Sequence, residues 1–298
     1  MTEDERYMTR ALQLAACGAG HVSPNPMVGA VIVAPGGRII GEGYHRRYGE
    51  AHAEVNAMAS VAEADLPLIA RSTMYVTLEP CSHHGKTPPC AAMLCRRGIA
   101  RVVIGTGDPN PMVSGRGVEM LRQAGIEVTE DCLRSDCRAI NVRFFTAQTK
   151  RRPWILLKWA EDSRGRMSLP DGAPLRISTP LTSTLMHAER AQCDAILVGT
   201  GTLLADNPRL DTRLWPGRSP RPVVFRSPRL DDPETRRRLA VFSRDPIVLD
   251  PSMTLCDNMS LLFERHGVTS LMVEGGRTLI DSFITAGLYD RIRVEKDC

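Results

Sequence analysis

The chain has 298 residues, of which 43% are hydrophobic and 24% charged, and its formal net charge is +4. These are ordinary globular proportions, and the length predicts two domains that can each bury a core. The small net charge and the scattered basic residues argue against a nucleic-acid partner. With no apolar run near the roughly 20 residues of a membrane span and no apolar N-terminal segment, we expect a cytoplasmic protein without a membrane partner.

The first half of the chain alternates helical and strand patterns. Residues 4–17 have the apolar spacing of a helix, and glycines follow them. Residues 28–33 and 38–44 flank Pro35-Gly36-Gly37, which predicts a hairpin. Further elements are expected at residues 51–64 (helix), 73–78 (strand), 90–97 (helix), 100–105 (strand), 118–123 and 126–129. Strands separated by helices predict an α/β domain.

The polar segment 148–153 ends in proline and is the best candidate for a linker. A second α/β series follows it. Strands are expected over residues 154–158, 195–199, 222–225, 246–249 and 270–273, and helices over 181–190, 234–239, 258–266 and 278–286. We therefore predict two domains, residues 1–147 and residues 153–298.

The strongest functional signal combines His52, Glu54, Cys81 and Cys90. A histidine and two thiolates supply three ligands for Zn²⁺ and leave the fourth position for water, whose pKa the metal lowers toward ~7. Glu54, two residues after the histidine, can stand beside that water and move its protons. This is the arrangement of the zinc nucleobase deaminases. We predict one Zn²⁺ per chain on His52, Cys81 and Cys90, with Glu54 as the catalytic residue.

The expected secondary structure suits this metal site. His52 and Cys90 fall at helix starts, and helix N-termini lower the pKa of a cysteine. A purely structural zinc site would need a fourth protein ligand, for which His83 and His84 are candidates, but it would need no general base. Eight residues separate the two cysteines, where the general deaminase signature has two, so we expect an inserted loop to shape the substrate pocket.

That loop carries a family resemblance. Residues 80–90, PCSHHGKTPPC, closely resemble the bifunctional deaminase/reductase of riboflavin biosynthesis, and residues 23–30, 41–45 and 105–111 match as well. The resemblance implies a cytidine-deaminase-like three-layer domain. It also implies a small phosphorylated substrate, a diaminopyrimidinone with a ribosylamino 5′-phosphate, hydrolysed at its 2-amino group. Asn25 and His45 would then hydrogen-bond the heterocycle, and Lys86 would face the phosphate.

The second half resembles the reductase domain of the same family, most clearly in residues 194–210 and 273–279. The resemblance implies a dihydrofolate-reductase-like α/β domain that uses NADPH to reduce the ribosyl chain to ribityl. Gly275-Gly276 precedes a helix, whose free amides can bind a phosphate. By correspondence, the cofactor contacts would be Ala160, Thr202, Asp206, Ser227 and Gly276, and the substrate contacts Arg190, Leu210, Arg213 and Glu274.

Three departures bear on the reductase. Residues 162–166 read DSRGR where the family has Ser-Leu-Asp-Gly-Lys/Arg, and Pro174 and Arg176 stand where Ser and Trp are usual. The family also continues beyond the position of Cys298, so we expect this domain to be short at its C-terminus. The alternatives are a deaminase with a degenerate second domain, another nucleobase or nucleotide deaminase, and a zinc-binding protein without turnover. The oligomeric state, including a homo-oligomer, stays open.

Overall fold

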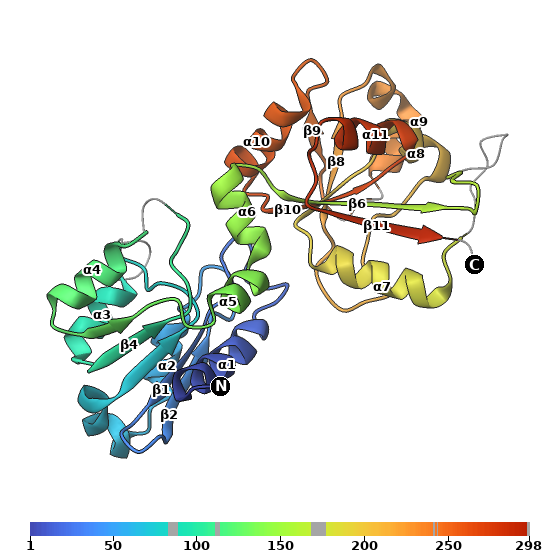
Figure 1. The fold of residues 1–298 in the computed structure, drawn as a ribbon. Helices are drawn as coiled ribbons and strands as arrows, with labels where there is room; N and C mark the ends of the chain where they lie inside the picture. The colour runs from blue at the N-terminus through green and yellow to red at the C-terminus, as the bar shows by residue number, and fades with distance from the viewer. Residues whose placement is uncertain (83–88, 111–113, 168–176, 241, 243, 297–298) are drawn as a thin grey trace. The chain divides into compact units, whose positions relative to one another are not determined.

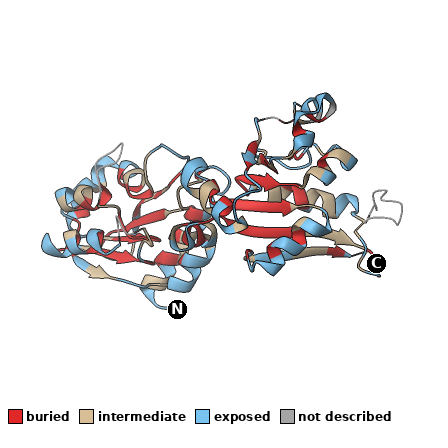
Figure 2. Cartoon of the chain, turned by 90° about the horizontal axis from the view of Figure 1, so that it is seen from above, coloured by how far each residue is buried: buried red, intermediate tan, exposed pale blue. Residues whose placement is uncertain are grey.

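The computed structural model describes residues 1–82, 89–110, 114–167, 177–240, 242 and 244–296. The chain forms two compact units, Met1–Thr149 and Lys150–Cys298 (Figure 1). In each unit the buried residues concentrate in the strands of a central sheet (Figure 2). No helix in the described part of the chain is long and apolar enough to cross a membrane.

The first unit is built on a five-stranded sheet of order β2-β1-β3-β4-β5. Strand β1 runs antiparallel to β2 and β3, whereas β3, β4 and β5 are parallel. The elements in chain order are α1 (Glu3–Ala16), β1 (Gly29–Val33), β2 (Ile39–Tyr44), α2 (Ala53–Ala59), the 3-10 helix η1 (Glu63–Arg71), β3 (Thr73–Val76), α3 (Cys90–Arg97), β4 (Arg101–Ile104), α4 (Arg116–Gln123), β5 (Glu127–Thr129), α5 (Arg134–Ile140) and α6 (Val142–Lys150).

The strands of this sheet are apolar on both faces, which gives the unit three layers. Ile32, Val76 and Ile104 pack with α2, α3 and α4 on one face. Val31 and Tyr75 pack with α1 and α5 on the other. Alternate residues of one strand thus face opposite helical layers, as the pleat requires. The predicted three-layer deaminase fold is confirmed.

Local sequence explains the ends of several elements. Thr2 caps α1, and the Glu5 side chain accepts from the Thr2 amide in return, which completes a capping box. Gly36 and Gly37 have φ of +89° and +86°, so the predicted hairpin between β1 and β2 turns on left-handed backbone. The helix expected over 51–64 is shorter, because α2 ends at Ala59 and the chain resumes as η1, which contains Pro67.

The second unit has a six-stranded sheet of order β11-β6-β10-β7-β8-β9, in which neighbouring strands are parallel. The elements are β6 (Trp154–Glu161), α7 (Pro180–Ala191), β7 (Ala195–Leu197), α8 (Thr200–Asp206), β8 (Arg221–Phe225), the 3-10 helix η2 (Pro228–Asp231), α9 (Pro233–Leu239), β9 (Ile247–Leu249), α10 (Leu255–His266), β10 (Ser270–Glu274), α11 (Arg277–Thr285) and β11 (Arg291–Lys296). Helices α10 and α11 cover one face, and α7 and α8 the other. The α/β class predicted for this half is confirmed.

Asp290 joins the start of the edge strand β11 to the start of its neighbour β6. Its carboxylate accepts from Arg152 Nη1 at 2.6 Å, from Lys150 Nζ at 2.8 Å and from the amide of Ile155 at 2.9 Å. Helix α6 extends to Lys150, so half of the segment proposed as a linker is helical. Helices α5, α6 and α8 and strand β11 were not anticipated from the sequence.

Candidate active sites

Three side chains converge in the first unit as a candidate metal centre. The Nδ1 atom of His52 lies 3.6 Å from Cys81 Sγ and 3.4 Å from Cys90 Sγ, and all three ligand atoms lie within 4.8 Å of one another. His52 is the N-cap residue of α2, Cys90 is the first residue of α3, and Cys81 follows β3. The structure therefore brings together the three residues that the sequence predicts as zinc ligands.

The surroundings of Cys81 favour a thiolate. Hydrogen bonds from the Cys90 thiol, from His52 and from the Cys90 amide outweigh burial and lower the pKa of Cys81 to about 4. The amide donates from the start of α3, with N and Sγ 3.3 Å apart. The pKa of Cys90 is raised, first by its bond to Cys81 and then by burial. A histidine and two sulfurs, one held ready as a thiolate, match the ligands that Zn²⁺ prefers.

Glu54 lies beside this centre and is buried, with 3% of its surface exposed. Burial, and after it the negative charge of Cys81, raises the pKa of its carboxyl to about 7. Such a carboxyl can take up and release a proton near neutral pH, which is what a general acid–base requires.

A cavity of about 450 Å³ opens onto the metal centre. His52, Glu54 and Cys81 line it, together with Asn25 and His45. The His45 ring meets the His52 ring edge-on at a centroid distance of 5.5 Å. Of the other residues predicted here, Lys86 lies outside the described part of the chain, as do His83 and His84.

The tautomer of His45 follows from its two contacts. Its Nδ1 lies 3.1 Å from the Ala51 carbonyl, which can only accept, so Nδ1 carries the proton. Its Nε2 then accepts from Asn25 Nδ2 at 3.2 Å. Burial lowers the pKa of His45, which favours this neutral ring.

Several cavity residues were not predicted. Asp108 and Asn110 belong to a matched segment, but nothing in that match indicated their position. Phe144 and Gln148 come from α6, which the sequence analysis did not anticipate. Pro24, Pro26 and Val28 also line the cavity and belong to residues 23–30, which the family resemblance implies face the substrate. The unpredicted lining residues are Tyr48, Gly49, Glu50, Leu78, Glu79, Asp108, Asn110, Phe144 and Gln148.

The second unit has a larger cavity, of about 970 Å³, at the carboxyl ends of β6, β7 and β10. Ligands of open parallel sheets bind at this end. Gly276 is the N-cap residue of α11, and its amide donates to Thr202 Oγ1 at 3.1 Å. Six of the residues predicted for this half line the cavity: Ala160, Thr202, Asp206, Leu210, Glu274 and Gly276.

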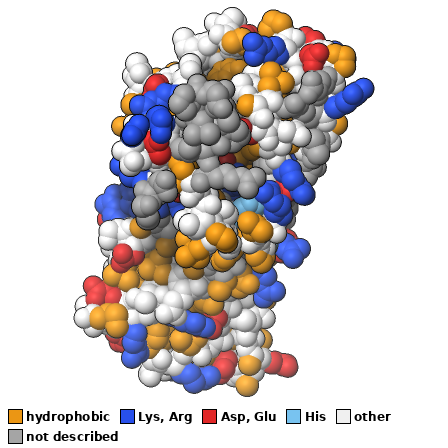
Figure 3. All heavy atoms as spheres, turned by 90° about the vertical axis from the view of Figure 1, so that its right-hand side faces the viewer, with side chains coloured by type: hydrophobic (Ala, Val, Ile, Leu, Met, Phe, Trp, Pro, Cys, Tyr) orange, Lys and Arg blue, Asp and Glu red, His pale blue; other side chains and the backbone are white. Residues whose placement is uncertain are grey.

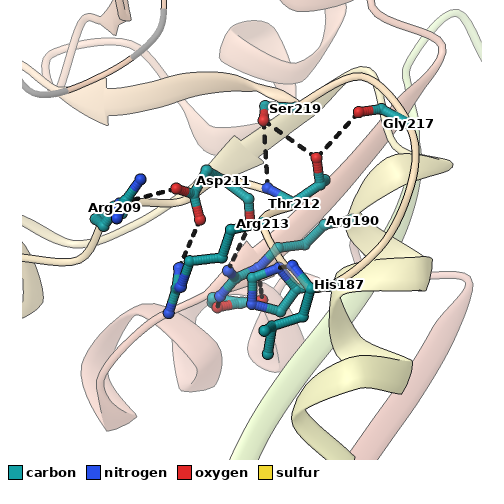
Figure 4. A network of polar contacts seen from close by, with 10 residues as sticks. His187, Arg190, Arg209, Asp211, Thr212, Arg213, Gly217 and Ser219 are labelled. Carbon is teal, nitrogen blue, oxygen red and sulfur yellow. Dashed lines mark hydrogen bonds and ion pairs between the residues drawn. The ribbon is translucent and has the colours of Figure 1, made fainter.

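The other predicted residues of this half lie outside the cavity lining. Arg190 donates to both oxygens of Glu274, at 2.9 and 2.6 Å, and to the Asp211 carbonyl (Figure 4). Arg213 pairs with the Asp211 carboxylate at 2.5 Å. Ser227 caps η2 by accepting from the amide of Arg229, and it is not among the residues that line the cavity.

The departures from the family pattern are only partly visible. The Asp162 carboxylate accepts from the amides of Arg164 and Arg166 and from the Arg166 guanidinium, which closes a turn after β6. Pro174 and Arg176 lie outside the described residues. On the face shown in Figure 3, the described Lys and Arg side chains are interspersed with acidic and apolar ones.

Comparisons with known proteins cover both units. A family model described as "Cytidine and deoxycytidylate deaminase zinc-binding region" matches residues 1–106, and "RibD C-terminal domain" matches residues 153–295. The riboflavin biosynthesis protein RibD of Aquifex aeolicus is 37% identical over 311 residues, which are 98% of this chain and 86% of the relative. The RibD of Escherichia coli K12 is 37% identical over 323 residues, covering 98% and 87%.

Solved structures agree with this match. A structure of Acinetobacter baumannii RibD superposes with a TM-score of 0.84 at 30% identity, covering 98% of this chain and 86% of the other. The Thermotoga maritima diaminohydroxyphosphoribosylaminopyrimidine deaminase/5-amino-6-(5-phosphoribosylamino)uracil reductase superposes with a TM-score of 0.83 at 39% identity, covering 95% and 84%. The similarity therefore spans both units.

Proposed function

The chain belongs to the RibD family and is a bifunctional enzyme of riboflavin biosynthesis, with a zinc-binding deaminase domain followed by a reductase domain. From this premise we propose its two reactions. The first unit hydrolyses the 2-amino group of 2,5-diamino-6-ribosylamino-4(3H)-pyrimidinone 5′-phosphate. The second unit then uses NADPH to reduce the ribosyl chain of the product to ribityl.

One observation carries the deaminase assignment. His52, Cys81 and Cys90 form a cluster of zinc-type ligands, and the buried carboxyl of Glu54 lines the same cavity as His52 and Cys81. Three protein ligands with access to a cavity suit a catalytic rather than a closed structural site. A Zn²⁺ ion held there supplies a water whose pKa is lowered toward ~7.

The residues of the chain then carry the proton transfers. Glu54 accepts a proton from the attacking water as the new C–O bond forms at C2, and delivers it to the ring nitrogen. A second proton then passes from the new hydroxyl group through Glu54 to the departing amine, so that a carbonyl forms at C2, the C–N bond breaks and ammonia leaves. Asn25 is held by His45 through its amide nitrogen, which leaves its carbonyl to accept from the heterocycle. Lys86 would face the phosphate.

In the second unit we propose that NADPH occupies the 970 Å³ cavity. Its contacts would be Ala160, Thr202, Asp206 and Gly276, with a phosphate near the start of α11, where unpaired helix amides attract anions. NADPH supplies the hydride for the sugar carbonyl. Leu210 and Glu274 would contact the sugar, and Arg190 holds Glu274 in place. Ser227 and Arg213 fit this assignment less well, because neither lines the cavity.

Replacing Glu54 tests the proposed deamination. Glu54→Gln should keep one zinc per chain and lose about 10²–10⁴ in the deamination rate, since an amide cannot accept the water proton. Glu50→Gln, at another carboxylate of the cavity, is the control. The assay identifies each product by mass with the diaminopyrimidinone phosphate, with and without NADPH. Full turnover by Glu54→Gln, or wild-type protein that binds no zinc, would refute the assignment.

A further inference from the structure

Glu79 has no part in the chemistry proposed above, yet it is a buried carboxylate two residues before Cys81, with 4% of its surface exposed. Its Oε1 accepts from the amide of Gly117 at 3.0 Å. Its Oε2 accepts from the amides of Gly115 at 3.0 Å and Asp108 at 3.3 Å. One side chain thus collects amides from three points of the chain that follows β4.

The backbone of Glu79 adds a fourth tie, because its amide donates to the Thr106 carbonyl at 2.9 Å. The backbone at Gly117 also lies directly against this segment. A Cβ atom added to Gly117 would stand 2.1 Å from the Pro80 carbonyl oxygen and 3.2 Å from Glu79 Oε1. The two segments are therefore in backbone contact, and the carboxylate sets how they meet.

We infer that Glu79 is a positioning residue of the deaminase site, an inference that rests on the function proposed above. It couples the segment bearing Cys81 to the residues after β4, where Asp108 and Asn110 form part of the cavity wall. The Glu79 carboxylate thus fixes the position of the cavity wall that contains Asp108 and Asn110 relative to the segment that contains Cys81.

The role requires a carboxylate in particular. Three N–H groups point at the side chain, so every position around it must accept. A glutamine in either orientation would turn its NH₂ group toward at least one of those amides, and two buried donors would then face each other. The wall carrying Asp108 would have to move away. Cys81 would stay in place, since the Cys90 amide holds it independently and the proposed zinc would hold it as well.

The test compares Glu79→Gln with Glu119→Gln, which changes an exposed carboxylate on the neighbouring helix α4. For Glu79→Gln we expect KM for the diaminopyrimidinone phosphate to rise at least tenfold and kcat to change less than threefold. One zinc per chain should remain, and reduction of the deaminated product should be unchanged. Glu79→Asp, which keeps only acceptors on a shorter stem, should give an intermediate KM.

Unchanged KM in both Glu79 variants would overturn the inference, and so would a lower melting temperature with normal KM in the folded protein. Loss of zinc from Glu79→Gln would also overturn it, because Glu79 would then act on the metal. If Glu79→Gln does not fold, the KM of Glu79→Asp decides in the same way. Wild-type protein that does not deaminate this substrate would refute the proposed function itself, and this inference with it.

Discussion

Asp290→Ala should destabilise the reductase unit while leaving the deaminase unit intact. The side chains of Asp290 and Arg152 are each only 9% exposed. Burial alone would raise the pKa of Asp290, but hydrogen bonds from Arg152, Lys150 and the Ile155 amide outweigh it and hold the pKa below its usual range. The variant leaves the Arg152 guanidinium buried without its carboxylate and removes the acceptor of the Ile155 amide.

Breaking a buried ion pair by removing one partner costs about 3–5 kcal/mol. In a unit of this size, each kcal/mol lowers the melting temperature by about 2–4 °C, so we expect a fall of roughly 6–20 °C. The matched control is Asp281→Ala, which breaks the exposed ion pair with Arg277. The side chains of Arg277 and Asp281 are 61% and 55% exposed, respectively. Exposed ion pairs contribute about 0–1 kcal/mol to stability, so the melting temperature of this control should lie close to that of wild type.

Scanning calorimetry with and without NADPH identifies the transition of the reductase unit, because a ligand raises the melting temperature of the unit that binds it. Ammonia release reports on the deaminase unit. A second variant, Arg152→Met combined with Asp290→Ala, should recover part of the loss, since no orphaned charge remains. A shift for Asp290→Ala no larger than that for Asp281→Ala would refute the reasoning.

Three further predictions follow from the sites and from the packing of α1. Cys81→Ser should lose zinc and thermal stability together, because the metal joins the end of a strand to the start of a helix; elemental analysis that still finds one zinc per chain would place the ligands elsewhere. Gly276→Val should fold, since φ there is −66°, but should weaken NADPH binding more than tenfold, or about 1.4 kcal/mol, in a fluorescence titration, and binding equal to wild type would contradict the phosphate site. The hydrogen bond from Arg101 lowers the pKa of Asp4, so their pair stabilises the fold above the unfolded pKa and loses this effect as the pH falls through the folded pKa. Asp4→Asn should therefore be less stable than wild type to urea at pH 7, by up to about 1 kcal/mol, and this difference should disappear as the pH falls below the unfolded pKa of about 3.9 and through the lower folded pKa.

The metal centre could be predicted because each of its residues lies in a short, recognisable stretch of sequence. His52 and Glu54 lie within one turn of a helix, and prolines mark the approach to Cys81 and Cys90. Residue type restricts the chemistry further, since few functions need a histidine, two cysteines and a neighbouring glutamate in this order. The structure adds the distances and the burial that the chemistry requires.

Other parts of the sites depend on contacts that no local pattern contains. Phe144 and Gln148 reach the deaminase cavity through α6, whose polar C-terminal end reads as a linker. From the sequence, Glu79 resembles an exposed charged residue, because its three amide donors come from residues after β4 that are distant in the chain. Strand β11 was not predicted because its residues are largely polar and only Glu295 is buried. The alternation of apolar and polar residues that identifies a strand is therefore weak.

The strand order of the second unit has a consequence for how the chain acquires its structure during synthesis. Strand β6 comes first in that unit, but its two neighbours, β10 and β11, are the last strands of the described chain. The first unit pairs β1 with the strands that directly follow it, so its sheet can assemble while later residues are still being added. Contacts between distant residues form slowly, and β6 must leave both edges unpaired until more than a hundred further residues have been made. We therefore expect the deaminase half to reach its native state first, and we expect the unpaired edges of β6 to be a site of aggregation in the nascent chain.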